Sequence, residues 1–341
     1  MERLTRAIAS KYLRWATRAT TLWWRLRGRR HLARERASAR AFHRILKMRW
    51  SAALDRLDLL VIRSRNSGAA FNSRHRPEAA TSNDYLFDAL TKLHARACRV
   101  ASEVVVLLRH GYPEGAHARW RTLHEIAVTM FFLKTHGPEV AERYLLHDAV
   151  RRYAAAEEYQ KHHQALGYEP YSQEELDSGR QVRDALVARF GDAYATQYGW
   201  AASVLSSPTF RSIEEAANMQ KWRPWFRMAS EGQHGGSHGV AFTLGLSAGG
   251  DDVLLAGASD AGLADPGTAA SISLVQATVA LLTSKLSFRG ARDAAAIAQA
   301  GDEAERTFAI ASRVSRSQPR VSHVLPRPLW RRRNVRVSSP R

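Results

Sequence analysis

The stretch LLRHGYPEGAHARWRTLHEIAVTMFFLKTHGPEVAERYLLHDAVRRYAAAEEY, from Leu107 to Tyr159, decides the fold of this chain of 341 residues. Pro113 suits the first turn of a helix, and Gly137-Pro138 ends that helix and begins the next one. The second half of the first helix, IAVTMFFL, is apolar on every side, which is typical of a helix inside a bundle. The stretch therefore predicts two antiparallel helices and an all-α protein.

The rest of the sequence indicates further helices on both sides of this hairpin. A polar segment rich in Asn, Ser and Arg, residues 66–83, predicts a loop, and residues 240–258 predict a small β-hairpin around Gly249-Gly250. We therefore expect a multi-helix bundle around a central helical hairpin at about 113–166, with at most this small β element. Helical periodicity and Gly or Pro stops predict helices at residues 1–28, 42–65, 84–109, 113–135, 138–166, 174–190, 212–219, 225–230, 266–287 and 289–313.

The positive charge of the chain is concentrated at its two ends. The net charge is +19, of which residues 1–50 contribute +13 and residues 313–341 contribute +9, so the middle is slightly acidic. The high pI therefore describes the ends, which weakens a direct inference to nucleic-acid binding. We expect a basic helical extension (1–65), a helical domain (84–313) and a disordered arginine-rich tail (314–341).

Residues 1–28 predict a basic amphipathic helix, with apolar residues at helical spacing and arginines on its other faces. Arginine beside tryptophan suits an anionic membrane surface or a phosphate backbone. A start at Met48 instead of Met1 would leave this segment out, and both starts stay open. We expect the basic ends to contact RNA or another acidic partner, with peripheral membrane contact by residues 1–28, and the chain could form a homodimer.

Composition excludes several kinds of site. Cys98 is the single cysteine of the chain, which excludes a disulfide framework and a cysteine-based zinc site. Its apolar neighbours predict a buried thiol. No stretch approaches the roughly 18 consecutive apolar residues of a membrane-spanning helix. The phosphate-loop, dinucleotide, HExxH and GxSxG motifs are missing from the sequence. We expect a cytoplasmic protein with no metal and no cofactor.

Charged side chains recur four residues apart on both helices of the hairpin, so those of each helix share one face. Folding the hairpin about Gly137 is expected to bring the two faces together. Unpaired buried charge costs several kcal/mol, so these groups must pair with one another. Two interpretations stay open: the cluster locks the register of the hairpin, or it lines a pocket for an anion or a proton. The cluster comprises Arg121, Glu125, His147, Asp148 and Arg151.

In the pocket interpretation, His147 supplies acid–base chemistry, and Arg121 or Arg151 binds a phosphate or carboxylate. The glycine-rich run SEGQHGGSHG could bring His234 to the cluster, because glycine allows close backbone approach. The expected catalytic residues are then Arg121, Glu125 and His147, and the expected substrate-binding residues are Arg143, Arg151 and His234.

The segments GAHARWRTLHEIAV, ERYLLH and RMASEGQHGG carry a family resemblance. Over roughly residues 85–285 the chain resembles a bacterial helical family known as domain of unknown function 5677. The resemblance implies an all-α fold and brings no settled activity. The matching positions are Gly115, Ala116, Arg119, Arg121, Leu123, Glu125, Tyr144, His147, Ser230 and His234.

The segment RWRTLH, residues 119–124, is also similar to the motif of HEPN ribonucleases, helical proteins of bacterial toxin and phage-defence systems. This resemblance implies that His124 activates the ribose 2′-hydroxyl while Arg119 stabilises the phosphorane, without a metal. The leading hypothesis is a HEPN-like RNA-acting protein of a defence or stress system, with this pair or the hairpin cluster as its site. The alternative is a non-catalytic helical interaction domain that its basic N-terminal helix attaches to a membrane or a partner.

Overall fold

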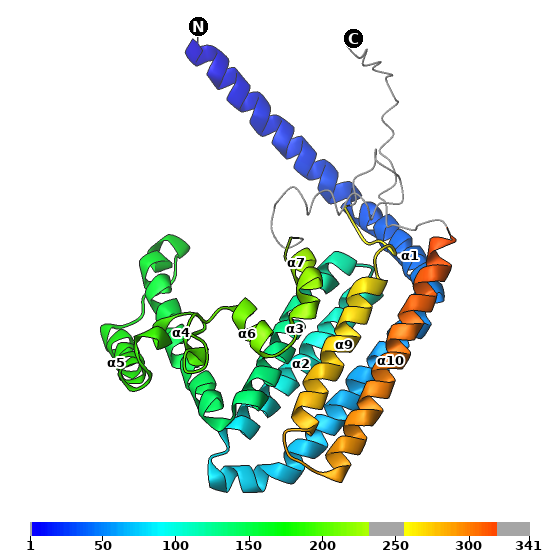
Figure 1. Ribbon diagram of the computed structural model, residues 1–341. Coiled ribbons are helices and arrows are strands. Elements are labelled where there is room, and N and C mark those ends of the chain that lie inside the picture. Colours follow the sequence, from blue (N-terminus) through cyan, green and yellow to red (C-terminus); the bar gives the residue numbers. More distant parts are fainter. Residues whose placement is uncertain (1, 232–255, 319–341) are drawn as a thin grey trace, which may run out of the picture.

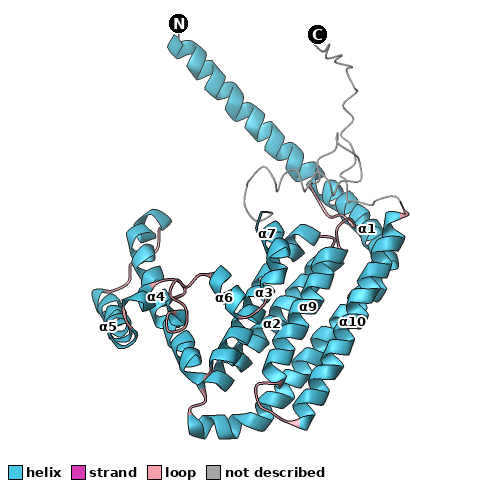
Figure 2. Ribbon diagram, viewed as in Figure 1, coloured by secondary structure: helices cyan, strands magenta, loops and turns pink. Residues whose placement is uncertain are grey.

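The computed structural model describes residues 2–231 and 256–318, and the regular elements of this part of the chain are all helices, without a strand (Figure 1). Figure 2 shows the helices joined by short loops. The predicted β-hairpin lies almost wholly outside the described residues, as does the tail beyond residue 318. The α-helices are α1 (Glu2–Ser82), α2 (Tyr85–Arg109), α3 (Pro113–His136), α4 (Pro138–Leu166), α5 (Gln173–Phe190), α6 (Phe210–Ala216), α7 (Arg223–Glu231), α9 (Ala264–Leu282) and α10 (Phe288–Arg316), with short 3₁₀ helices η1 (Asp192–Ala195), η2 (Gly199–Ala201) and η3 (Gln220–Trp222).

Local sequence signals set the ends of the central helices. The Asp84 carboxylate accepts a hydrogen bond from the backbone N–H of Phe87 at 2.9 Å and so caps α2. Pro113 occupies the first turn of α3. Gly137, with φ of +86°, ends α3 and precedes α4. The predicted boundaries at these three turns are confirmed.

Five helices form the core bundle: the second half of α1, α2, α3, α9 and α10. Of these, α9 contacts all four of the others, and its small and apolar residues are buried on nearly every side. Close packing explains its composition, since a Cβ at Gly267 would come within 2.3 Å of the Phe308 ring on α10. The predicted bundle is therefore confirmed, and α9 lies at its centre beside α3.

The helix α1 is continuous to Ser82, so the predicted loop at residues 66–83 is wrong. Three residues of this stretch, Gly68, Phe71 and Ala79, are buried against the bundle, while the Asn, Ser and Arg residues around them face outward. A narrow apolar stripe is enough to hold a polar helix on a core. The first half of α1 projects away from the bundle (Figure 1).

The second helix of the hairpin, α4, leaves the bundle and leans away from α3 (Figure 1). The segment that contains η1 and η2 separates the two helices. The ring of Trp200 packs edge to face against Phe132 of α3 and Tyr144 of α4, with ring centroids 5.5 Å and 5.0 Å apart. Tyr194 is fully buried next to α4. These aromatic side chains occupy the space in which the hairpin faces were expected to meet.

Candidate functional site

The most buried polar group of α3 is His124, whose side chain is fully buried. Its Nε2–H donates to Oε1 of Glu214 on α6 at 2.8 Å, and Glu214 is also fully buried. The other carboxylate oxygen of Glu214 lies 2.5 Å from the guanidinium of Arg223 at the start of α7. The three residues thus form an ionic network that ties α3 to α6 and α7.

Aromatic rings surround this network. The centroid of the His124 ring lies 5.8 Å from the ring centroid of Phe226 and 6.2 Å from that of Phe210. The guanidinium groups of Arg223 and Arg121 lie over the Phe226 ring at 5.4 Å and 4.6 Å. Cations over aromatic faces gain energy from the ring quadrupole. The arrangement excludes water from His124 and favours a structural role for it.

Arg119 and His124, the predicted catalytic pair, do not converge within the chain. Arg119 turns toward α2, where it pairs with Glu103, whereas His124 turns toward α6. The helix itself separates them, because five residues of α-helix rotate a side chain by about 140°. The ribonuclease roles of this pair stay a hypothesis that this geometry does not favour.

Arg119 does share a surface cavity with two other predicted residues, Arg121 and Glu125. The cavity has a volume of about 500 Å³ and is lined also by Gly115 and Thr122. Glu125 lies 3.3 Å from the guanidinium of Arg121. Burial raises the pKa of Glu125, against the opposing effect of Arg121. The structure therefore brings together the part of the predicted cluster that lies on α3.

The predicted cluster residues His147 and Asp148 on α4 have other partners than Arg121 and Glu125. The Nε2–H of His147 donates to the carbonyl oxygens of Tyr194 at 3.1 Å and Thr196 at 2.9 Å, and burial lowers the pKa of His147. Asp148 pairs with its neighbour Arg152 at 2.8 Å on the exposed side of α4. The predicted pairing of Arg121 and Glu125 with His147 and Asp148 is therefore wrong, because α4 diverges from α3.

The three predicted substrate-binding residues do not come together among the described residues. Arg143 donates hydrogen bonds to the carbonyl oxygens of Phe190 and Trp200, both at 3.3 Å, so it holds the segment that separates α3 from α4. Arg151 is exposed on α4. His234 lies outside the described residues. Sequence reasoning missed Glu214 and Arg223, because nothing local marks a partner that is 90 residues away from His124.

A second candidate surface is the projecting half of α1. In the part of the chain that the structure describes, the hydrogen bonds and ring contacts of residues 12–34 lie within α1 itself. Large apolar side chains are nevertheless exposed along it, with Trp15 at 67% and Leu26 at 71%. No described helix is long and apolar enough to cross a membrane. The exposed apolar side chains are Tyr12, Leu13, Trp15, Leu22, Trp23, Trp24, Leu26 and Leu32.

Comparison with known proteins gives one match. The model of a family of unknown function, DUF5677, matches residues 87–251, as the resemblance of the sequence predicts. The match covers α2 to α7 and leaves α1, α9 and α10 outside. No curated protein and no solved structure matches the chain.

Proposed function

We propose that this chain, which through residues 87–251 belongs to the family of unknown function DUF5677, is a helical binding protein that attaches to an anionic membrane surface through the first half of α1. The observation that carries the proposal is the projecting helix with its exposed tryptophan, leucine and arginine side chains. Apolar side chains of this size are exposed at a cost unless something covers them.

The order of residues along α1 supports a membrane surface in particular. Tyr12, Trp15, Leu22 and Leu26 follow one another at intervals of three, seven and four residues, so they share one side of the helix. Such a stripe inserts into the boundary between lipid headgroups and acyl chains, and tryptophan favours that boundary. A phosphate backbone of RNA would leave the two leucines exposed.

The arginines of α1 form a second stripe beside the apolar one. Arg18, Arg25, Arg29 and Arg36 recur at intervals of seven, four and seven residues, and all four are exposed. Each basic residue close to an anionic membrane contributes about 1 kcal/mol of attraction. A helix that lies flat in the interface can therefore use both stripes at the same time, with the apolar side chains inserted and the guanidinium groups at the phosphates.

Sedimentation with vesicles tests the proposal. The full chain is mixed with vesicles of phosphatidylcholine alone, or of phosphatidylcholine with phosphatidylglycerol. One variant removes the apolar stripe (Trp15→Gln, Leu22→Gln and Leu26→Gln), and another removes charge (Arg18→Gln, Arg25→Gln and Arg29→Gln). We expect binding to anionic vesicles only, with a loss of about tenfold or more in either variant, since each removes several favourable contacts.

A matched control replaces exposed apolar residues elsewhere. Ile310 and Val314 on α10 are 53% and 47% exposed, and their change to Gln should leave vesicle binding intact. A single-stranded RNA oligomer provides the competing test. RNA binding that the charge variant loses and the apolar variant keeps, together with no sedimentation with anionic vesicles, would overturn the proposal in favour of nucleic acid.

A further inference from the structure

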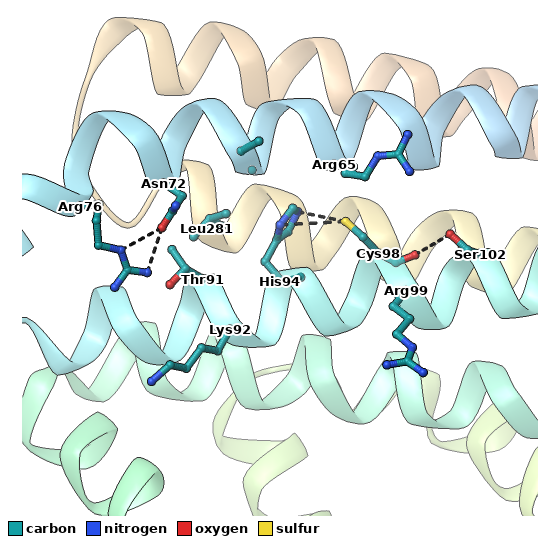
Figure 3. A pocket seen from close by; sticks show the side chains of 13 residues that line it. Arg65, Asn72, Arg76, Thr91, Lys92, His94, Cys98, Arg99, Ser102 and Leu281 are labelled. Carbon is teal, nitrogen blue, oxygen red and sulfur yellow. Dashed lines mark hydrogen bonds between the residues drawn. The ribbon is translucent and has the colours of Figure 1, made fainter.

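A groove between α1 and α2 has no role in the membrane contact proposed above. Its volume is about 560 Å³, within the range of small-molecule sites. Figure 3 shows its side chains: His94, Cys98 and Leu281 form the inner wall, while Arg65, Arg76, Lys92 and Arg99 surround them. The groove is separate from the cavity lined by Arg119, Arg121 and Glu125 on α3, and the two share no lining residue.

Small residues keep the groove open. Gly68 packs directly on His94, and a Cβ at this position would come within 2.3 Å of the imidazole ring. Ala69 on α1 and Ala95 on α2 also line the groove, and both are exposed to solvent. Larger side chains at these positions would fill the space between the two helices, so the cavity depends on this run of small residues.

The inner wall carries no charge at neutral pH. Burial lowers the pKa of His94 to about 4 and raises the pKa of the Cys98 thiol to about 12. Nε2 of His94 lies 3.2 Å from the Thr278 hydroxyl of α9, which fixes the ring. A neutral imidazole, a thiol and Leu281 together provide a weakly polar surface against which an uncharged ring system can pack.

The outer residues of the groove, unlike its inner wall, are positively charged. The described residues that line it include four cations and no carboxylate. At one end Arg76 and Lys92 share the carboxylate of Asp88, at 2.6 and 2.9 Å. At the other end Arg99 is 3.4 Å from Glu103, and Arg65 has no carboxylate partner among residues 2–231 and 256–318. The groove therefore carries excess positive charge, with guanidinium groups suited to phosphate oxygens.

We propose that this groove binds a small molecule that carries phosphate groups, about the size of a nucleotide. The phosphates contact Arg65 and Arg99, and the uncharged body packs on the wall formed by His94, Cys98 and Leu281. The cavity volume, the absence of carboxylates from its described lining and the uncharged inner wall each fit a ligand of this kind.

Calorimetric titration with ATP tests the proposal on the full chain in about 150 mM salt, which weakens the long-range attraction of ATP to the arginines of the projecting half of α1. Ala69→Phe fills the groove without changing any charge, and we expect it to weaken ATP binding at least tenfold. Arg65→Gln removes one expected phosphate contact and should weaken binding severalfold. Arg63→Gln is the matched control: Arg63 is exposed two residues away on α1 and does not line the groove, so its removal should leave ATP binding unchanged.

Circular dichroism and the urea midpoint show whether Ala69→Phe still folds, as its exposed position predicts. Tripolyphosphate is a second probe, because it would bind to a site that contacts only the phosphate groups of ATP. The proposal fails if neither ATP nor tripolyphosphate binds at millimolar concentration. It fails equally if folded Ala69→Phe binds ATP like the wild type, or if Arg63→Gln loses as much affinity as Arg65→Gln. Either of these last results would assign ATP to general attraction by the basic chain.

Discussion

Buried ionisable side chains in this protein are held by partners from distant parts of the chain. His124 of α3 and Arg223 of α7 both pair with Glu214 of α6, and these two residues also contact the same pair of phenylalanine rings. A carboxylate in such a place is tolerated only because its partners replace the hydration it loses. The network therefore fixes the positions of α6 and α7 on the bundle.

Glu214→Gln should destabilise the protein by about 3 kcal/mol, because it leaves the Arg223 guanidinium without a counter-charge in a largely buried place. Urea denaturation measures the change in the free energy of unfolding. Glu215 provides the control, since it pairs with Arg211 at 2.8 Å on the exposed side of the same helix. Glu215→Gln should cost about 0.5 kcal/mol or less. Equal effects of the two substitutions would contradict the structural role given to Glu214.

The stability of the protein should fall in acid partly because of His94. Burial lowers the pKa of His94 to about 4, while the unfolded chain has the ordinary value of about 6.5. Between these values the unfolded state binds a proton that the folded state does not, so this contribution is complete above pH 6.5 and is lost as the pH falls toward 4.

We therefore expect the wild type to lose about 3 kcal/mol more than His94→Gln in its free energy of unfolding between pH 7 and 4. Urea titrations at several pH values measure this difference. His162→Gln changes an exposed histidine of α4 and should retain the full loss of the wild type. Parallel pH profiles of the wild type and His94→Gln would show that His94 is not buried as a neutral ring.

The sequence predicted single residues well only where the signal was local. Burial of Cys98 and the start of a helix at about Asp84 follow from the neighbouring residues, and both predictions are confirmed. The partner of His124 could not be predicted, because no periodicity links α3 to α6. The divergence of Arg119 from His124 could have been predicted, since a spacing of five residues places two side chains on different sides of a helix.

Among the elements, α1 differs most from expectation because two different environments act along one helix. From Phe42 onward its apolar residues are buried in the bundle, and packing carries it through the polar stretch at 66–82. Over residues 12–34 the hydrogen bonds and ring contacts lie within α1 itself, so the helicity of this stretch depends on propensity. Polar composition therefore predicted a loop where packing imposes a helix.

Gly28→Ala should stabilise the projecting half of α1. Gly28 is inside the helix, and a Cβ there would meet no atom within 4 Å. Alanine removes the entropic cost of glycine, about 0.5–1 kcal/mol, so amide exchange in residues 22–34 should slow about two- to fivefold. Hydrogen-exchange mass spectrometry measures the rates. Ala33→Gly, at an exposed position nearby, should accelerate exchange by a similar factor. Unchanged rates in both variants would mean that this segment is not helical in solution.

The helix α4 shows why the hairpin was predicted but its site was not. Gly137 and Pro138 determine where α3 ends and α4 begins, and these positions are readable from the sequence. The angle between the two helices depends instead on Tyr194 and Trp200, which follow more than 50 residues after the turn. A tight hairpin would place the charged residues of α3 and α4 opposite one another. The aromatic segment lies between the two helices instead, and no local sequence pattern predicts that position.

At the level of the whole molecule, the chain consists of a bundle that is stable by its packing and a helix that extends beyond it. The bundle holds the buried network of His124 and the groove between α1 and α2. The extended helix carries a dense run of exposed apolar side chains, among them Trp15, Trp23 and Trp24, and much of the excess charge. Membrane contact and ligand binding would then depend on different parts of the same molecule, joined by α1.

This division predicts that the projecting half of α1 can be removed without loss of the bundle. Deletion of residues 2–40 ends just before Phe42, the first buried residue of the core. The free energy of unfolding in urea should change by less than about 1 kcal/mol, because exposed residues contribute little. Sedimentation with anionic vesicles should be lost, while ATP titration in the groove should be retained.

A longer deletion, of residues 2–50, provides the comparison. It removes Phe42, Leu46 and Trp50, which are at most 4% exposed, and Trp50 contacts the Phe308 ring of α10 at 6.4 Å. Loss of large buried side chains costs about 3–5 kcal/mol for each aromatic residue, so this variant should unfold at much lower urea concentration or fail to fold. If both deletions destabilise the bundle equally, the first half of α1 packs on the protein in solution, and its exposed stripe would then be a folding surface and not a membrane contact.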